Sequence, residues 1–200
     1  MSVVTARSRR LDYSESTRKA LVGSAIELFT AQGYAATSLD AVARRALVTK
    51  GALYHHFSGK QALFEAAVDA VETVSMKRVA DIVSGPGEPW DLAMRGIRAF
   101  VEVCLDPSFQ RIVIHEAPVV MGWERWQDGK HYSYGLVRLT IERLIESGLI
   151  APLPVEVAAR MLFGTLSAGA MIIAGAADQR KASDQVSTVI FALLEGMRRE

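Results

Sequence analysis

Apolar residues recur at helical spacing along most of the chain. Between residues 17 and 32 they lie three or four positions apart, and Gly33 follows where a helix commonly ends with a residue at positive φ. Sustained alternation of apolar and polar residues, which would indicate a strand, occurs in no segment. The pattern predicts an all-α protein of about nine helices. After the first helix, the expected ranges are 39–46, 50–57, 58–84, 90–104, 109–116, 134–147, 155–177 and 183–199.

Hydroxyl residues mark the starts of three short helices in succession. Ser38 precedes the second helix and Thr49 precedes the third, and each side chain can accept a hydrogen bond from a first-turn N–H. Ser58, with Gln61 three residues later, forms a capping-box pattern before the fourth helix. The second and third helices, joined by a tight turn, have the pattern of a helix-turn-helix, whose second helix enters the major groove of DNA.

Charge is distributed unevenly along the chain, although the formal net charge is only +1. Residues 1–60 contain nine basic and four acidic residues, a net charge of +5, and the remainder carries −4. This asymmetry favours phosphate binding at the N-terminal end. Residues 1–16, which include Arg7, Arg9 and Arg10 without a following apolar run, are predicted to form a flexible basic arm and not a secretory signal.

Candidate chemistry excludes several classes of protein. Cys104 is the single cysteine, which rules out an intrachain disulfide or a cysteine-based zinc cluster and suits a reducing cytoplasm. His115 and Glu116 are neighbours, but adjacent helix residues point in different directions, and no third ligand accompanies them at metal-site spacing. With no nucleophile–base arrangement, phosphate-binding glycine loop or metal-ligand spacing, we expect neither an enzyme, nor a cofactor, nor a metal site.

A family resemblance is visible in residues 41–57 (AVARRALVTKGALYHHF) and in GKQALF at 59–64. Together with the preceding helix and its GYAATS exit at 33–38, they resemble the DNA-binding signature of TetR (tetracycline repressor)-type regulators over residues 17–66. The resemblance implies a helix-turn-helix DNA-binding domain over 17–60. It also implies a helical ligand-binding and dimerisation domain over 61–200.

Eight residues are implied to contact DNA. Base-facing positions are Thr49, Gly51, Ala52 and His55, and phosphate-contacting positions are Ser38, Lys50, Tyr54 and Lys60. Hydroxyl, ammonium and phenol groups can bond phosphate oxygens, and a methyl can contact thymine. Two positions depart from the family: Leu47 replaces the usual turn glycine, and Ala52 replaces a hydroxyl residue, so one polar contact is expected to be missing.

The last two helices are expected to pair subunits. Residues 161–177 carry no charge, are slightly shorter than a membrane span of about 20 residues, and contain small residues that allow close helix approach. We therefore expect an intersubunit helix and no membrane span. Two helices from each chain would form a four-helix dimer bundle. The predicted interface residues are Leu162, Leu166, Val186, Val189, Ile190, Leu193, Leu194 and Met197.

Aromatic and methionine residues in the middle of the chain are the candidates for a ligand pocket. They are Phe100, Cys104, Phe109, Ile112, His115, Met121, Trp123, Trp126 and Tyr134. The resemblance implies a cytoplasmic repressor that binds a palindromic operator as a homodimer and is released by a small, largely apolar effector. Two alternatives stay open: a C-terminal domain that only dimerises or binds a protein partner, and an activator.

Overall fold

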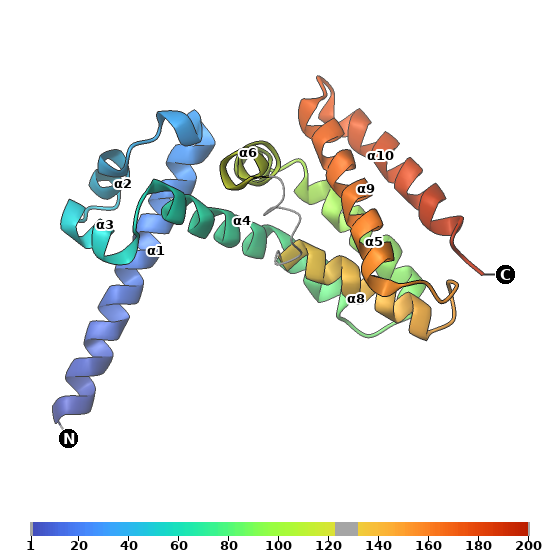
Figure 1. Ribbon diagram of the computed structural model, residues 1–200, viewed down its shortest axis with the longest axis horizontal. Coiled ribbons are helices and arrows are strands. Elements are labelled where there is room, and N and C mark those ends of the chain that lie inside the picture. The colour runs from blue at the N-terminus through green and yellow to red at the C-terminus, as the bar shows by residue number, and fades with distance from the viewer. Residues whose placement is uncertain (1, 123–131, 200) are drawn as a thin grey trace.

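Every element named in the described part of the chain is a helix, as expected. The computed structural model describes residues 2–122 and 132–199, with side chains from residue 13 onward. Figure 1 shows α1, α2 and α3 at one end of the molecule and α5, α8, α9 and α10 at the other, with α4 running between the two ends. The bounds are α1 Ser2–Ala36, α2 Leu39–Arg45, α3 Lys50–His56, α4 Lys60–Val83, α5 Pro89–Val103, η1 Phe109–Glu116, α6 Ala117–Met121, α8 Tyr132–Glu146, α9 Val155–Gly175 and α10 Gln179–Glu195.

Helix α1 starts at Ser2, so the described part of residues 1–16, the segment predicted to be a flexible arm, is helical. No glycine or proline interrupts residues 2–16, and an ion pair of 2.7 Å between Lys19 and Glu15 lies on the same helix. Helical geometry breaks at Gly33, which has a φ of 83°. The end of the first helix is therefore where the sequence predicts it.

The N-caps of α2 and α3 and the turn between these helices define the helix-turn-helix. Ser38 Oγ accepts a hydrogen bond from the Ala41 N–H at 3.1 Å, and Thr49 Oγ1 accepts one from the Ala52 N–H at 3.2 Å, which confirms both predicted N-caps. Between the helices, Leu47 has a φ of 56°, the left-handed conformation in which glycine is usual. A left-handed L-residue costs about 1–2 kcal/mol. The turn thus keeps its geometry despite the leucine.

Helix α4 joins the two ends of the molecule. Its N-cap is Gly59, which has no side chain to cap with, and Gln61 instead donates to Glu65 at 3.2 Å. The predicted capping box of Ser58 and Gln61 is therefore wrong. Phe64 packs edge-on against Phe29 of α1, with ring centroids 5.1 Å apart, and so fixes α4 to the DNA-binding end.

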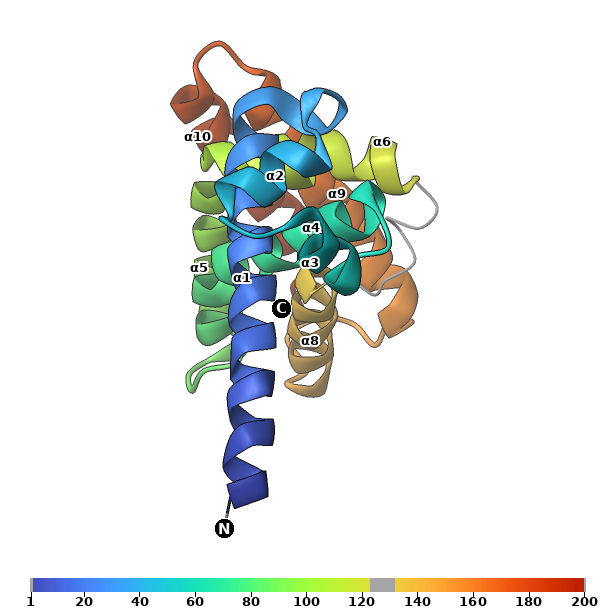
Figure 2. The same cartoon turned by 90° about the vertical axis from the view of Figure 1, so that its left-hand side faces the viewer.

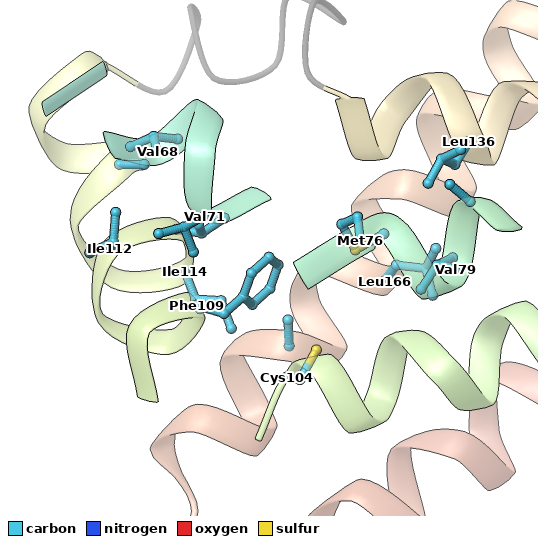
Figure 3. Close-up of a cluster of buried hydrophobic side chains, with 14 of the residues drawn as sticks. Val68, Val71, Met76, Val79, Cys104, Phe109, Ile112, Ile114, Leu136 and Leu166 are labelled. Carbon is cyan, nitrogen blue, oxygen red and sulfur yellow. The ribbon is translucent and has the colours of Figure 1, made fainter. Parts of the chain in front are cut away.

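The C-terminal half is a bundle in which α4 packs against α5 and α8, α8 against α9, and α9 against α10. Side chains from α4, η1, α8 and α9 point toward one another inside it, and Phe109 of η1 lies between two groups of aliphatic residues (Figure 3). Helix α10 begins four residues before its predicted start, because Asp178 caps it by accepting from the Lys181 N–H at 3.0 Å.

Candidate DNA-binding surface and ligand cavity

The recognition helix α3 has one buried and one exposed face. Leu53 and Phe57 are buried, and Arg18 of α1 lies over the Phe57 ring at 5.0 Å. Figure 2 shows α2 and α3 on the end of the molecule that faces the viewer. Most of the residues around this helix that are predicted to contact DNA are exposed to solvent. Ala52 is half-buried. The exposed positions are Ser38, Thr49, Lys50, Gly51, Tyr54 and His55.

Two of the predicted phosphate-binding lysines have partners within the chain. Lys50 Nζ lies 2.9 Å from Asp40, and this contact raises the pKa of the Lys50 ammonium. Lys60 Nζ donates to the Ala35 carbonyl at 3.1 Å and lies 4.4 Å from the centre of the Tyr34 ring. An ammonium has three donors, so each lysine keeps donors for a phosphate. The Lys60 contacts also join the start of α4 to the end of α1.

The two histidines of α3 differ in environment. His55 is exposed and His56 is half-buried. Burial, followed by the nearby His55 and Arg18, lowers the pKa of His56. Because His56 is partly covered and His55 is exposed, His55 remains the histidine of α3 that is predicted to face the bases.

An apolar cavity lies inside the C-terminal bundle. Its volume, measured as space open to the centre of a water molecule, is about 90 Å³. It is bounded by α4, α5, η1, α6, α8, α9 and α10. The lining residues are Met76, Val79, Val83, Ala93, Gly96, Ile97, Phe100, Phe109, Val113, Ile114, Pro118, Ser133, Leu136, Val137, Thr140, Leu162, Phe163, Leu166, Ser167, Ala170, Met171 and Leu194.

The predicted pocket residues are only partly brought together. Phe100 and Phe109 line this cavity, whereas Cys104, Ile112, His115, Met121 and Tyr134 do not. Trp123 and Trp126 lie outside the described residues.

The π-helical geometry of η1 explains why Ile112 does not line the cavity. In η1 the backbone bonds run from i to i+5, so Val113 and Ile114 join Phe109 on the cavity face and Ile112 turns into the core. An α-helical spacing would have placed Ile112 beside Phe109. His115 is exposed on the outer side of the same segment.

Cys104 and Tyr134 are buried behind the cavity wall. Tyr134 packs edge-on against the lining residue Phe163, with ring centroids 5.6 Å apart. Burial raises the pKa of the Cys104 thiol to about 12, so the thiol is protonated and unreactive at neutral pH. Met121 is half-buried at the end of α6. Sequence reasoning missed the cavity residues of α4, α8 and α9, because aliphatic residues at helical spacing are equally typical of a solid core.

One contact connects the cavity wall to the DNA-binding end. Glu116, the last residue of η1, accepts hydrogen bonds from the Tyr34 N–H at 2.8 and 3.0 Å and pairs with Arg111 Nε at 3.1 Å. A Cβ on Gly33 would lie 2.2 Å from the Arg111 guanidinium and 2.6 Å from Glu116, both ends of flexible side chains, and the φ of 83° is what favours glycine at this position. The side chains on the opposite face of η1 line the cavity.

Apolar side chains form an exposed stripe on α9 and a second one on α10. On α9, exposed residues recur every three or four positions; they are Val157, Met161, Gly164, Ala168, Ile172 and Gly175. On α10, Val189 and Leu193 are 58% and 53% exposed, with the exposed Ala192 beside them. The two exposed stripes of these neighbouring helices are together called the α9–α10 face.

The predicted interface residues fall into three groups by exposure. Val189 and Leu193 lie on the α9–α10 face, whereas four others are buried within their own subunit, because α10 uses the neighbouring stripe to pack on α9. Those four are Leu166, Val186, Ile190 and Leu194. Leu162 and Met197 are half-buried.

Two family models match the chain. Residues 21–67 match the model described as bacterial regulatory proteins of the tetR family. Residues 90–197, more than half of the chain, match the model described as the tetracyclin repressor-like C-terminal domain.

Curated relatives and solved structures agree with the models. The transposon Tn10 TetC protein of Escherichia coli is 30% identical over 158 residues, which cover 75% of this chain and 76% of the relative. The regulator AcrR of Shigella flexneri is 26% identical over 164 residues, covering 77% of this chain and 76% of AcrR. A TetR-family regulator from Pectobacterium atrosepticum superposes with a TM-score of 0.79 and 29% identity, covering 94% of this chain and 97% of its own. The chain therefore belongs to the TetR family of transcriptional regulators, DNA-binding proteins that are not enzymes.

Proposed function

We propose that this chain is a cytoplasmic, homodimeric repressor that binds a palindromic operator and is released from it by a small, largely apolar ligand. The observation that carries the proposal is that η1, which lines the apolar cavity, also contacts the DNA-binding end, where Glu116 accepts from the Tyr34 N–H. The cavity supports a ligand-binding role over a C-terminal domain that only dimerises. Repression predicts that deleting the gene raises transcription from the promoter that carries the operator; a fall would indicate an activator.

Dimerisation is part of the proposed DNA-binding mechanism. A helix-turn-helix dimer reads two half-sites about one turn of DNA apart, roughly 34 Å, and its two-fold axis requires a palindromic site. The α9–α10 face supports pairing with a second copy, because two helices from each chain complete a four-helix bundle. Its small residues, such as Gly164 and Ala168, allow close helix approach.

Helix α9 is also long and apolar enough to cross a membrane by length and composition. Its best window has a mean hydropathy of 1.6, and 28% of that window is buried within the subunit. Pairing through the α9–α10 face would cover the exposed part. We therefore assign α9 to a subunit interface and not to a membrane.

Two connections are proposed to carry the ligand signal. Helix α4 begins directly after the recognition helix and lines the cavity with Met76, Val79 and Val83. Segment η1 lines the cavity with Phe109 and holds the end of α1 through Glu116. A ligand lowers operator affinity when it binds more tightly to a conformation in which the recognition helices have a different spacing. The size of this effect is limited by the difference between the ligand's affinities for the two conformations.

The DNA-binding assignment predicts different effects for phosphate and base contacts. Tyr54→Phe removes one phosphate-bonding hydroxyl, and Lys60→Met removes one charge; both should weaken binding to operator and random duplexes alike. Lys60→Met should also reduce the salt dependence of binding. His55→Ala should change the preference among operator variants by about 1–3 kcal/mol at one base pair. Fluorescence anisotropy with labelled duplexes at several salt concentrations measures all three.

The control is the relative affinity for operator and random DNA. If all three variants weaken both duplexes by the same factor, the assignment of His55 to a base contact is wrong. Circular dichroism of each variant checks that the overall helix content is unchanged, which matters for Lys60 because of its contacts with Ala35 and Tyr34.

The contact between η1 and α1 makes a prediction about stability. Glu116→Ala leaves the Tyr34 N–H and Arg111 without their acceptor and should lower the free energy of unfolding by about 1 kcal/mol. Glu116→Gln keeps one acceptor oxygen and should cost less. Urea denaturation of the two variants beside the unchanged chain measures the difference. Equal stability of all three would mean that this contact does not hold the two ends together.

A further inference from the structure

Three hydroxyls are the polar side chains among the described residues that line the cavity. Each of them already donates its hydrogen to the protein. Thr140 Oγ1 donates to the Leu136 carbonyl at 2.8 Å. Ser167 Oγ donates to the Phe163 carbonyl at 2.8 Å. Ser133 Oγ donates to the Glu72 carboxylate, which also accepts from the Ser133 N–H at 3.3 Å.

A hydroxyl has one hydrogen to donate and two lone pairs that accept. Because the hydrogens of Ser133, Thr140 and Ser167 are used inside the protein, these groups offer acceptors to a ligand. A ligand hydroxyl or N–H can be satisfied by them. A ligand whose polar atoms only accept would lose its bonds to water on entering and find no matching donor among these three groups, which costs affinity.

Charge selects against anions in the same cavity. Glu72 is 2% exposed and lies directly behind Ser133. Among the described lining residues there is no lysine, arginine or histidine. A carboxylate ligand would therefore lose its hydration without finding a counter-ion among the described lining residues.

We propose that the cavity selects an uncharged, mainly apolar molecule that carries a hydrogen-bond donor, such as a phenol or an alcohol, over acceptor-only and carboxylate analogues. The inference rests on the proposed function, in which this cavity is the ligand site. A water-sized sphere needs about 10–15 Å³ of such volume. The cavity of about 90 Å³ therefore has room for roughly six to nine such spheres, which suits a small ligand. The donor group is placed at Ser133, Thr140 or Ser167, and the aliphatic and phenylalanine residues surround the rest.

A matched series of three probes tests the selection. The three probes share a propylphenyl body. 4-Propylphenol carries a hydrogen-bond donor, 4-propylanisole carries a group that only accepts, and 4-propylbenzoate carries a negative charge. Isothermal titration calorimetry on the full-length protein without DNA should give a dissociation constant for the phenol at least tenfold lower than for the other two. Equal or tighter binding of the anisole or the benzoate would overturn the inference.

Variants of the hydroxyls locate the acceptor. At least one of Ser133→Ala, Thr140→Val and Ser167→Ala should bring phenol affinity down to that of the anisole, while anisole affinity stays unchanged and shows that the cavity is intact. Phenol preference unaffected by all three variants would overturn the inference. A protein that binds operator DNA but does not bind the phenol would also overturn it, and would leave the DNA-binding part of the proposed function standing.

Discussion

Leu193→Asp is expected to convert the protein to monomers in sedimentation velocity and to weaken operator binding by roughly 100-fold or more. Leu193 is 53% exposed on the single chain, so aspartate at this position is hydrated in the monomer and need not disrupt folding. In the dimer the same carboxylate would be buried on the α9–α10 face without a partner. Because the two half-sites are bound together, loss of the dimer removes the gain in affinity from simultaneous binding.

Val74→Asp is the matched control for this prediction. Val74 is 77% exposed on α4, away from the α9–α10 face, so the same substitution should leave a dimer with unchanged operator affinity. Circular dichroism and thermal melting confirm that both variants fold. An intact Leu193→Asp dimer would move the interface away from α10.

Gly51→Ala is expected to have opposite effects on stability and on DNA binding. A Cβ at this position would meet only Thr49 Oγ1, at 3.9 Å, so the fold has room for a methyl group. Alanine in place of a helical glycine stabilises by about 0.5–1 kcal/mol. On α3, however, the methyl group would separate the backbone from the DNA surface, and operator affinity should fall about tenfold, equivalent to 1.4 kcal/mol.

Gly135→Ala on α8 is the control for this second prediction. Gly135 is also exposed and has open space around its Cβ position, so alanine there should stabilise by a similar amount without changing operator affinity. Thermal unfolding and anisotropy measured on the same samples separate the two effects. If Gly51→Ala binds operator as tightly as the unchanged chain, this part of α3 does not approach DNA closely.

Short-range signals allowed the DNA-binding end to be predicted from the sequence. Ser38 and Thr49 cap the helices that they precede, and Gly33 has the positive φ expected after the first helix. Each of these features is set within four residues of the chain. The resemblance of residues 17–66 added the DNA-contacting positions, whose roles remain predictions.

The C-terminal half was harder to predict, because its signals depend on packing between distant segments. A stripe of apolar residues shows that a helix face is covered, but not whether its own subunit or a second copy covers it. On α10, Ile190 faces its own bundle and Val189 faces outward, although they are neighbours. In η1 the π-helical backbone rotates Ile112 out of the cavity, and no feature of the sequence indicated that geometry.

Selection of binding sites from a library of random DNA duplexes tests the central claim most directly. A homodimeric TetR-family regulator should enrich a palindrome whose two half-sites lie about one helical turn apart, 10–10.5 base pairs from centre to centre, or a multiple of that spacing. Leu193→Asp, used in parallel, should fail to enrich the same palindrome. Enrichment of a single, asymmetric site, or of no sequence at all, would contradict the account.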